Sequence, residues 1–319
     1  MKLIQRSFER EEDYWAIRAF LRKVYLLNGR RETSWPAARL DYWRSRSSDI
    51  AGDGSLEGGI FLWETEQGDI VAVLNREDDG HAFFQIDPCL RTSRLEGEML
   101  DLAEQRLAAT GKRSGRLALA VWTTDGDTLR EALLADRGYQ RKPEWQHYTR
   151  YLDLTYPLRE VCAPDGYTVR AMTLDDIPSR SWASWRAFHP DEPDSDYEGH
   201  DWYESLLRAP LYRRDLDLVA ADESGNVVAF CTVWYDDVTR SGYFEPVGTM
   251  PEHQRCGLST ALLHEGMRRL KERGAVQASV GGGGASNPHA EGVYARAFGS
   301  DCDSVTGWVK YLGDGLVTE

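Results

Sequence analysis

Residues 247–263 read Val247-Gly-Thr-Met-Pro-Glu-His-Gln-Arg-Cys-Gly-Leu-Ser-Thr-Ala-Leu-Leu263. This pattern predicts a strand that ends near Pro251, a short turn, and a helix that begins at about Gly257. Gly257 and Ser259 are small, so an anion can approach the backbone at the helix start. The first amides of a helix lack partners within it and lie at the positive end of the helix dipole. The stretch is therefore a candidate phosphate-binding turn.

Two common phosphate motifs do not describe this turn. The P-loop requires Gly-Lys-Ser/Thr, whose lysine contacts a γ-phosphate and whose hydroxyl contacts magnesium, and residues 247–263 contain no such triplet. The dinucleotide fingerprint requires three glycines at the start of a parallel βαβ unit. The turn is therefore expected to bind its anion through backbone amides alone.

The 319 residues favour two domains, because a typical domain has roughly 150 residues. A segment with two prolines and a glycine, 153–166, is typical of a linker. The order of predicted elements is similar on both sides of it, and a shift of 163 positions aligns Pro88 with Pro251 and Leu95 with Leu258. In the first half we expect strands at 3–8, 60–64, 70–75, 82–86, 117–122 and 147–152, and helices at 13–25, 95–109 and 128–136. In the second half we expect strands at 167–171, 216–221, 227–234, 242–250, 276–280 and 306–312, and helices at 258–273 and 288–297. The economical interpretation is one α/β unit present twice; the alternative is two unrelated domains.

Two motifs of the second half resemble the GCN5-related N-acetyltransferase (GNAT) family. Gln254-Arg-Cys-Gly-Leu-Ser259 is similar to the family hallmark Gln/Arg-x-x-Gly-x-Gly/Ala, with Ser259 where the family prefers Gly or Ala. Asn287-Pro-His-Ala-Glu-Gly-Val-Tyr294 is similar to the family's Asn-x-x-Ala/Met-x-x-x-Tyr helix, although Phe298-Gly299 reverses the usual Gly-Phe that follows. The resemblance covers roughly 166–315 and extends to the first half in element order only. It implies an α/β (α+β) fold of two tandem GNAT-like domains, 1–155 and 166–319, each a mixed, mostly antiparallel sheet flanked by helices.

The resemblance implies direct acetyl transfer from acetyl-CoA to a primary amine of a small molecule, in a ternary complex. Acetyl-CoA is then a co-substrate in a V between the strands that end at Met250 and Val280. Tyr294 is implied as the acid that protonates the departing thiolate. The implied cofactor-binding residues are Val247, Gly248, Thr249, Gln254, Arg255, Cys256, Gly257, Leu258, Ser259, Thr260 and Asn287.

A protonated amine must lose a proton to react, and Glu245 is the candidate base beside the implied thioester site. Strand alternation places Glu245 on one face with Tyr243 and Val247, although Pro246 can introduce a bulge. The plainer interpretation is a solvated strand residue or an ion-pair partner.

The first half lacks the small residues of the anion-binding turn. Arg94 aligns with Gly257, and Glu96 aligns with Ser259. A bulky arginine hinders close approach, and a carboxylate repels a pyrophosphate. We therefore expect residues 1–155 to keep the fold but not the cofactor.

Several other features have competing interpretations. Cys256 lies at a helix start, where thiol pKa values fall, yet no His and Asp or Asn accompany it as a nucleophile requires. His253 and His289 are alternative bases or ordinary surface histidines. The run Gly281–Gly284 is either a closely approached wall of the site or a plain loop. The acidic segment 188–197 either attracts a cationic amine or is simply solvated.

Composition excludes several classes of protein. The net charge of −14 disfavours nucleic acid and anionic membranes as partners. The five dispersed cysteines form no C-x-x-C pair, so neither a disulfide framework nor a metal site is expected. No apolar run is long enough for a membrane span, and the start lacks the apolar core of a signal peptide, so we expect a cytoplasmic protein. We expect the protein to be either a monomer or a homodimer. The alternatives to small-molecule acetylation are a catalytically weak acyl-CoA-binding or interaction module and a peptide or protein N-acetyltransferase.

Overall fold

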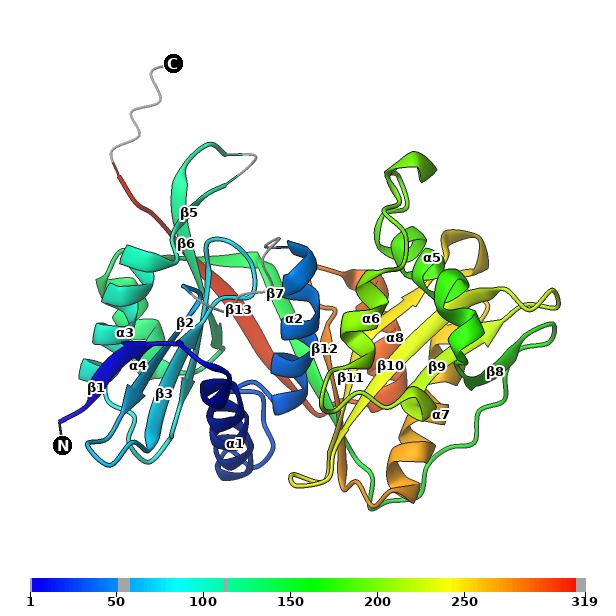
Figure 1. The fold of residues 1–319 in the computed structure, drawn as a ribbon, viewed down its shortest axis with the longest axis horizontal. Coiled ribbons are helices and arrows are strands. Elements are labelled where there is room, and N and C mark those ends of the chain that lie inside the picture. Colours follow the sequence, from blue (N-terminus) through cyan, green and yellow to red (C-terminus); the bar gives the residue numbers. More distant parts are fainter. Residues whose placement is uncertain (1, 51–57, 112–113, 314–319) are drawn as a thin grey trace.

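The computed structural model describes residues 2–50, 58–111 and 114–313, and its centre is one continuous sheet (Figure 1). The strands are β1 Ile4–Ser7, β2 Ile60–Glu64, β3 Ile70–Asn75, β4 His81–Ile86, β5 Ala109–Thr110, β6 Leu117–Thr124, β7 Gln140–Asp153, β8 Thr168–Ala171, β9 Asp217–Ala221, β10 Val227–Asp236, β11 Ser241–Thr249, β12 Gln277–Gly282 and β13 Cys302–Tyr311. The helices are α1 Glu11–Leu27, α2 Ala37–Ile50, α3 Ser93–Arg106, α4 Thr128–Asp136, α5 Ile177–Phe188, α6 Trp202–Leu207, α7 Leu258–Glu272 and α8 Pro288–Phe298, with short 3-10 turns η1 Leu174–Asp176, η2 Asp194–Asp196, η3 Arg214–Leu216 and η4 Pro251–His253.

Helices cover both faces of the sheet in each half, because the strands are apolar on both sides. In β2, Phe61 and Trp63 pack toward α3, whereas Ile60 and Leu62 pack toward α1 and α2. In the second half, α7 and α8 cover one face and α5 and α6 cover the other. Burial on two faces is typical of α/β architecture. The expected mixed α/β fold with two similar halves is therefore confirmed.

The two halves exchange their last strands. The strand order is β1-β2-β3-β4-β6-β13-β7-β12-β11-β10-β9-β8. The final strand β13 lies between β6 and β7 of the first half, and β7 in turn pairs antiparallel with β12 of the second half. The linker region near 153–166 thus separates the halves in sequence, while backbone hydrogen bonds join them into one sheet.

Helix α2 belongs to the first half in sequence but packs against the second half. It contacts α6 and β10, and Ala37 and Ala38 share an apolar cluster with Trp234 and Tyr243 (Figure 1). Helix α2 is not predicted from the sequence, because its apolar residues follow helical spacing only weakly. This helix brings residues of the first half to the candidate site.

Candidate active site

The site forms where two neighbouring parallel strands diverge. β11 and β12 are paired from Ser241 and Gln277 as far as Phe244 and Val280, and their pairing ends there. Beyond this point residues 245–249 and 281–282 separate into a V. Beyond this point the facing backbone groups of β11 and β12 have no partner in the opposite strand, so they are available to a ligand. α7 follows β11 through the turn 250–257, so the helix start lies at the end of the same strand.

The turn before α7 leaves the amides of the helix start open. Gly257 is the N-cap, with φ 85° and no side-chain cap, and the first turn contains no acidic residue. Residues 254–257 are exposed. A 15-residue helix with uncapped first amides is a favourable place for a phosphate group. The geometry of the turn thus fits the pyrophosphate of a nucleotide cofactor.

Side chains around this turn hold β11 against α7. The hydroxyl groups of Thr249 and Ser259 lie 2.9 Å apart, and Gln254 Nε2 donates to the Thr249 carbonyl at 3.3 Å. At Gly248 a Cβ atom would lie 2.4 Å from the Phe230 ring, so the strand and α5 require glycine there. The carboxyl end of β11 is therefore held by specific contacts on both sides.

The remaining members of the implied cofactor set follow the same path. Val247 packs on the apolar cluster under α7, and Leu258 is buried there. Arg255 has φ 62°, and Cys256 donates weakly from Sγ to the Gln254 carbonyl at 3.5 Å. Thr260 is half-buried in the first turn of α7. Together with the residues above, these place every member of the set except Asn287 along β11, the turn and the first turn of α7.

Asn287 and Tyr294 lie on α8, on the other arm of the V. Asn287 is the N-cap of α8, where its Oδ1 accepts from the Ala290 amide at 3.1 Å. Tyr294 is 8% exposed, and its ring lies 3.8 Å from where Gly282 would carry a Cβ. Burial raises the pKa of Tyr294, with the charge of Glu245 adding to the effect. The phenol therefore stays protonated at neutral pH and is available as a proton donor.

Glu245 lies in a bulge of β11. Phe244 pairs with Val233 and Val247 pairs with Cys231, so β11 has one more residue than β10 at this point. Because of the extra residue, Tyr243 packs on the α5 side whereas Val247 packs on the α7 side. The expectation that Glu245 shares a face with both is therefore wrong for Val247. A bulge interrupts the strict alternation of side chains between the two faces of a strand.

The environment of Glu245 favours its neutral form. Burial raises the pKa of Glu245 to about 7, against the opposing influence of the Arg39 guanidinium. Its Oε2 atom is buried and has no hydrogen-bond partner among the described residues. Trp234 Nε1 donates to the Glu245 carbonyl at 2.6 Å and thereby holds the backbone. A carboxyl group with these properties can accept a proton near neutral pH.

The first half contributes charged side chains that sequence reasoning missed. Arg39 on α2 pairs with Glu32 and with Glu77, each at 2.7 Å, and the charges of both glutamates raise the pKa of Glu245. A Cβ at Gly281 would lie within 4.0 Å of Glu32 Oε2 and 3.7 Å of the Tyr243 hydroxyl. No local sequence motif predicts this cluster, because its members are far apart in sequence.

The glycine run 281–284 packs tightly rather than forming an open loop. A Cβ at Gly283 would lie 2.7 Å from Glu291 Oε2, and one at Gly284 would lie 2.8 Å from the Gln146 carbonyl oxygen. Both have positive φ. The run therefore lets β12 turn closely against β7 and α8, next to the opening of the V.

The corresponding place in the first half is occupied by ion pairs. β4 and β6 are paired only at His81–Ala82 and then diverge. At the start of α3, Glu96 is completely buried and pairs with Arg91 and with Arg130, the latter at 2.9 Å. The expectation that Arg94 blocks the turn is wrong, because its side chain is 88% exposed and pairs with Glu98.

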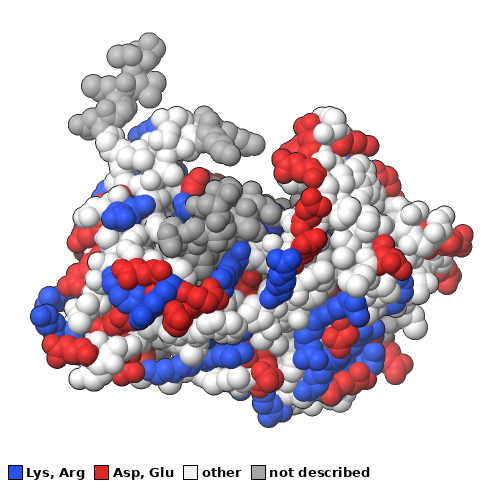
Figure 2. All heavy atoms as spheres, viewed as in Figure 1, with Lys and Arg blue, Asp and Glu red and all other residues white. Residues whose placement is uncertain are grey.

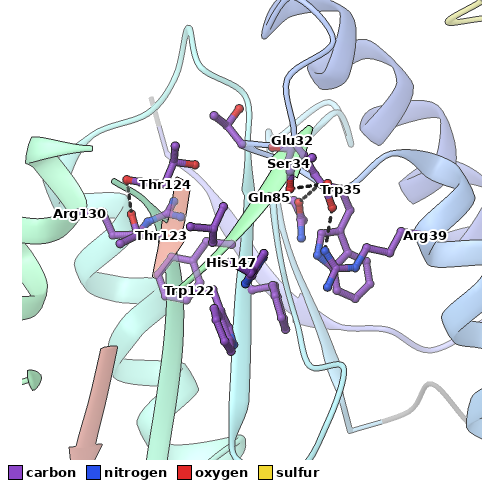
Figure 3. Close-up of a pocket in the computed structure, with 15 residues that line it drawn as sticks. Glu32, Ser34, Trp35, Arg39, Gln85, Trp122, Thr123, Thr124, Arg130 and His147 are labelled. Atoms are coloured by element: carbon purple, nitrogen blue, oxygen red, sulfur yellow. Dashed lines mark hydrogen bonds and ion pairs between the residues drawn. The ribbon is translucent and has the colours of Figure 1, made fainter. Parts of the chain in front are cut away.

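The diverging strands of the first half enclose a cavity of about 50 Å³ (Figure 3). Trp122 stacks on Phe83 and on Trp145 beside it. Burial lowers the pKa of His147, which also lines the cavity, to about 4. Such a volume suits about one or two water molecules. The aromatic filling and the small cavity leave no open V of the kind seen between β11 and β12.

The other candidate residues lie around the rim. His253 is hydrogen-bonded to the Tyr167 hydroxyl at 3.0 Å, and Cys256 and His289 are exposed. Acidic side chains gather on the projecting loop after α5, where Asp191, Glu192, Asp194 and Asp196 are exposed (Figure 2).

Within 2–50, 58–111 and 114–313, no three His, Cys, Asp or Glu side chains cluster as a metal site would require. None of the helices described has the length and apolar character of a membrane span.

Comparison with known proteins relates the second half to a family. Residues 174–299 match the family model described as the Acetyltransferase (GNAT) family, and this range contains β9–β12, α7 and α8. The second half is therefore similar to the GNAT acetyltransferases. The solved structure of a tandem GNAT protein from the clavulanic acid biosynthesis pathway superposes with a TM-score of 0.66 at 13% identity, covering 98% of this chain and 100% of that one. The fold is therefore a tandem GNAT fold.

Two curated relatives carry the name mycothiol acetyltransferase. The protein of Paenarthrobacter aurescens (strain TC1) is 25% identical over 219 residues, which cover 64% of this chain and 62% of that protein. The protein of Streptomyces griseus subsp. griseus is 28% identical over 230 residues, covering 68% and 65%. The matched part spans less than two thirds of the length of each relative, and the similarity is distant.

Proposed function

We propose that the chain is an acetyl-CoA-dependent N-acetyltransferase that acts on a primary amine of a small molecule, with its catalytic site in the second half. The observation that carries the proposal is the uncapped start of α7 beside the diverging strands β11 and β12. Its amides and small residues suit the pyrophosphate, and the V suits the pantetheine arm. The match to the GNAT family model supports acetyl-CoA as the co-substrate.

In the proposed mechanism Glu245 accepts a proton from the ammonium group of the acceptor, directly or through water. The free amine then attacks the thioester carbonyl carbon, the carbon–sulfur bond breaks, and Tyr294 donates its proton to the departing thiolate. The nitrogen loses its second proton as the amide forms, and this proton returns through water to the phenolate of Tyr294. Glu245 and Tyr294 lie on opposite arms of the V, which suits their opposite roles. Glu245 and the two glutamates that act on it, Glu32 and Glu77, outnumber the single arginine, Arg39, so the site has an excess of negative charge when ionised, which favours a cationic acceptor.

The proposal is tested by thiol release from acetyl-CoA with a panel of amines. The panel contains glucosamine, spermidine, tyramine and the acceptor of the mycothiol acetyltransferases, because the two relatives bear that name. Glu245→Gln is expected to lower kcat/KM by about 10²-fold for the best amine, whereas the exposed Glu223→Gln leaves it unchanged. Tight acetyl-CoA binding without thiol release for any amine would instead favour a binding module.

We further propose that the first half binds no acetyl-CoA. The buried Glu96 with its two arginines, and the aromatic filling between β4 and β6, support this assignment. Isothermal titration calorimetry of the full chain is expected to give one acetyl-CoA per chain. Two sites per chain would contradict the assignment.

A further inference from the structure

An ion-pair bridge from the first half lies next to the proposed base of the second half. Arg39 Nη1 contacts Glu32 Oε1 and Nη2 contacts Glu77 Oε2, both at 2.7 Å. The guanidinium lies over the Trp35 ring, 4.6 Å from its centroid (Figure 3). Glu32 Oε2 accepts from Thr149 on β7 at 3.2 Å. Arg39 is therefore held on three sides in a defined orientation.

The bridge is joined to Glu245 through packed neighbours. Arg39 and Tyr42 are three residues apart on α2, so they lie on one side of the helix. Tyr42 packs against Trp234, with ring centroids 5.8 Å apart, and Trp234 donates to the carbonyl of Glu245. On the other side, Glu32 Oε2 and the Tyr243 hydroxyl converge at Gly281. The Oε2 atom of Glu245 is buried and has no hydrogen-bond partner among the described residues.

We propose that Arg39 is a positioning residue that keeps Glu245 ready to accept a proton, so that the first half completes the site of the second half. The inference rests on the proposed role of Glu245 as base. Arg39 acts through space on the carboxylate and does not itself touch the reacting atoms. The first half, without a cofactor turn of its own, then has a role in the reaction of the other half.

The groups that face Glu245 shift its pKa in opposite directions. Arg39 stabilises its charged form, as does hydrogen bonding to Tyr243, whereas Glu77 and Glu32 destabilise it. Tyr42 on α2 and Tyr294 on α8 also interact with Glu245, and Arg180 on α5 lies beyond Tyr42. Since Arg39 and Glu77 oppose each other, removing them should shift the pKa of Glu245 in opposite directions. A general loss of structure would not produce opposite shifts.

The test is an infrared titration of the full chain without substrate. The carboxylic acid band of Glu245 is isolated as the difference between a protein with Glu245 and the same protein with Glu245→Gln. Arg39→Met is expected to move the titration midpoint up by about one pH unit, and Glu77→Gln to move it down by a similar amount. Arg39→Lys keeps the charge and should stay near the wild-type midpoint. Arg94→Met and Glu98→Gln, an exposed pair of the same kind, are the matched controls.

A midpoint that stays unchanged in Arg39→Met, or shifts of the same sign in Arg39→Met and Glu77→Gln, would overturn the inference. If Arg39→Met does not fold, Arg39→Gln replaces it in the same titration. The pH at which kcat/KM falls on the acid side, measured with the best amine of the panel, should shift in the same directions as the infrared midpoints. If the infrared midpoints move but Glu245→Gln retains full activity, Arg39 still sets the pKa of Glu245, but the role of Glu245 as base fails and with it the proposed role of Arg39 in the reaction.

Discussion

Tyr294 shows how burial prepares a single side chain for its proposed task. It is 8% exposed in the apolar cluster under α8, and burial raises its pKa. A phenol that stays protonated holds a proton for the departing thiolate, and its raised pKa at the same time makes it a weaker acid. The same burial would suit an ordinary core tyrosine, so the distinction requires an experiment.

Tyr294→Phe is expected to lower kcat by about 10²-fold while leaving acetyl-CoA affinity nearly unchanged, because only the proton donor is lost. Steady-state thiol release and calorimetry measure the two quantities. Tyr156→Phe, at a tyrosine that is 68% exposed, is the matched control. An unaltered kcat in Tyr294→Phe would remove Tyr294 from the mechanism.

Glu245 titrates in the range where enzymes are usually assayed. Burial raises its pKa to about 7, and a base must be deprotonated to act. Activity is therefore expected to rise with pH through about 7 in the wild type, and this limb of the pH profile should be absent in Glu245→Gln. The pH profile of kcat/KM is the measurement, and a limb that persists in Glu245→Gln would contradict the role.

At the scale of elements, the first turn of α3 contains the carboxylate of Glu96, whereas the first turn of α7 contains no acidic residue. Ser259→Glu places in the second half the charge that Glu96 has in the first. Acetyl-CoA affinity is expected to fall at least about tenfold through repulsion of phosphate, while the helix itself tolerates an acidic first turn. Ser259→Gln removes the same contact with Thr249 without adding charge, so it separates charge from shape. Equal affinities in the two variants would place the pyrophosphate elsewhere.

The turn after β12 depends on glycine for packing as well as for conformation. Gly284→Ala would bring a Cβ to 2.8 Å from the backbone of β7, at φ +67°. Gly225→Ala adds a Cβ at φ +85° with nothing within 4 Å. Both variants should lose about 1 kcal/mol from backbone strain, and Gly284→Ala roughly 1–3 kcal/mol more from the clash. Chemical denaturation measures both, and equal losses would show that the close packing costs nothing.

At the scale of the whole molecule, the strand exchange predicts one cooperative unit. Backbone hydrogen bonds join β13 to β6 and β7, and they join β7 to β12. Neither half can therefore unfold without breaking the sheet of the other. Differential scanning calorimetry is therefore expected to show a single unfolding transition. Gly307→Val, beside Trp145, should lower the Tm of the entire chain. Two separate transitions would contradict this expectation.

Sequence alone was sufficient wherever the cause is local. The turn 247–263, the capping role of Asn287 and the order of strands and helices follow from short-range backbone preferences and small residues at a helix start. The GNAT family model matches residues 174–299, which contain both motifs that carry the resemblance. The same motifs predicted a second half with an anion-binding turn and a first half without one.

Only the tertiary structure determined which distant residues meet. The bulge that moves Val247 away from the face of Tyr243 arises from the pairing of β11 with β10. The exchange of β13 and β7, and the placement of Arg39 beside Glu245, depend on contacts between segments up to hundreds of residues apart. A net charge of −14 and a local motif contain no information about such pairings, because long-range contacts depend on how whole elements pack.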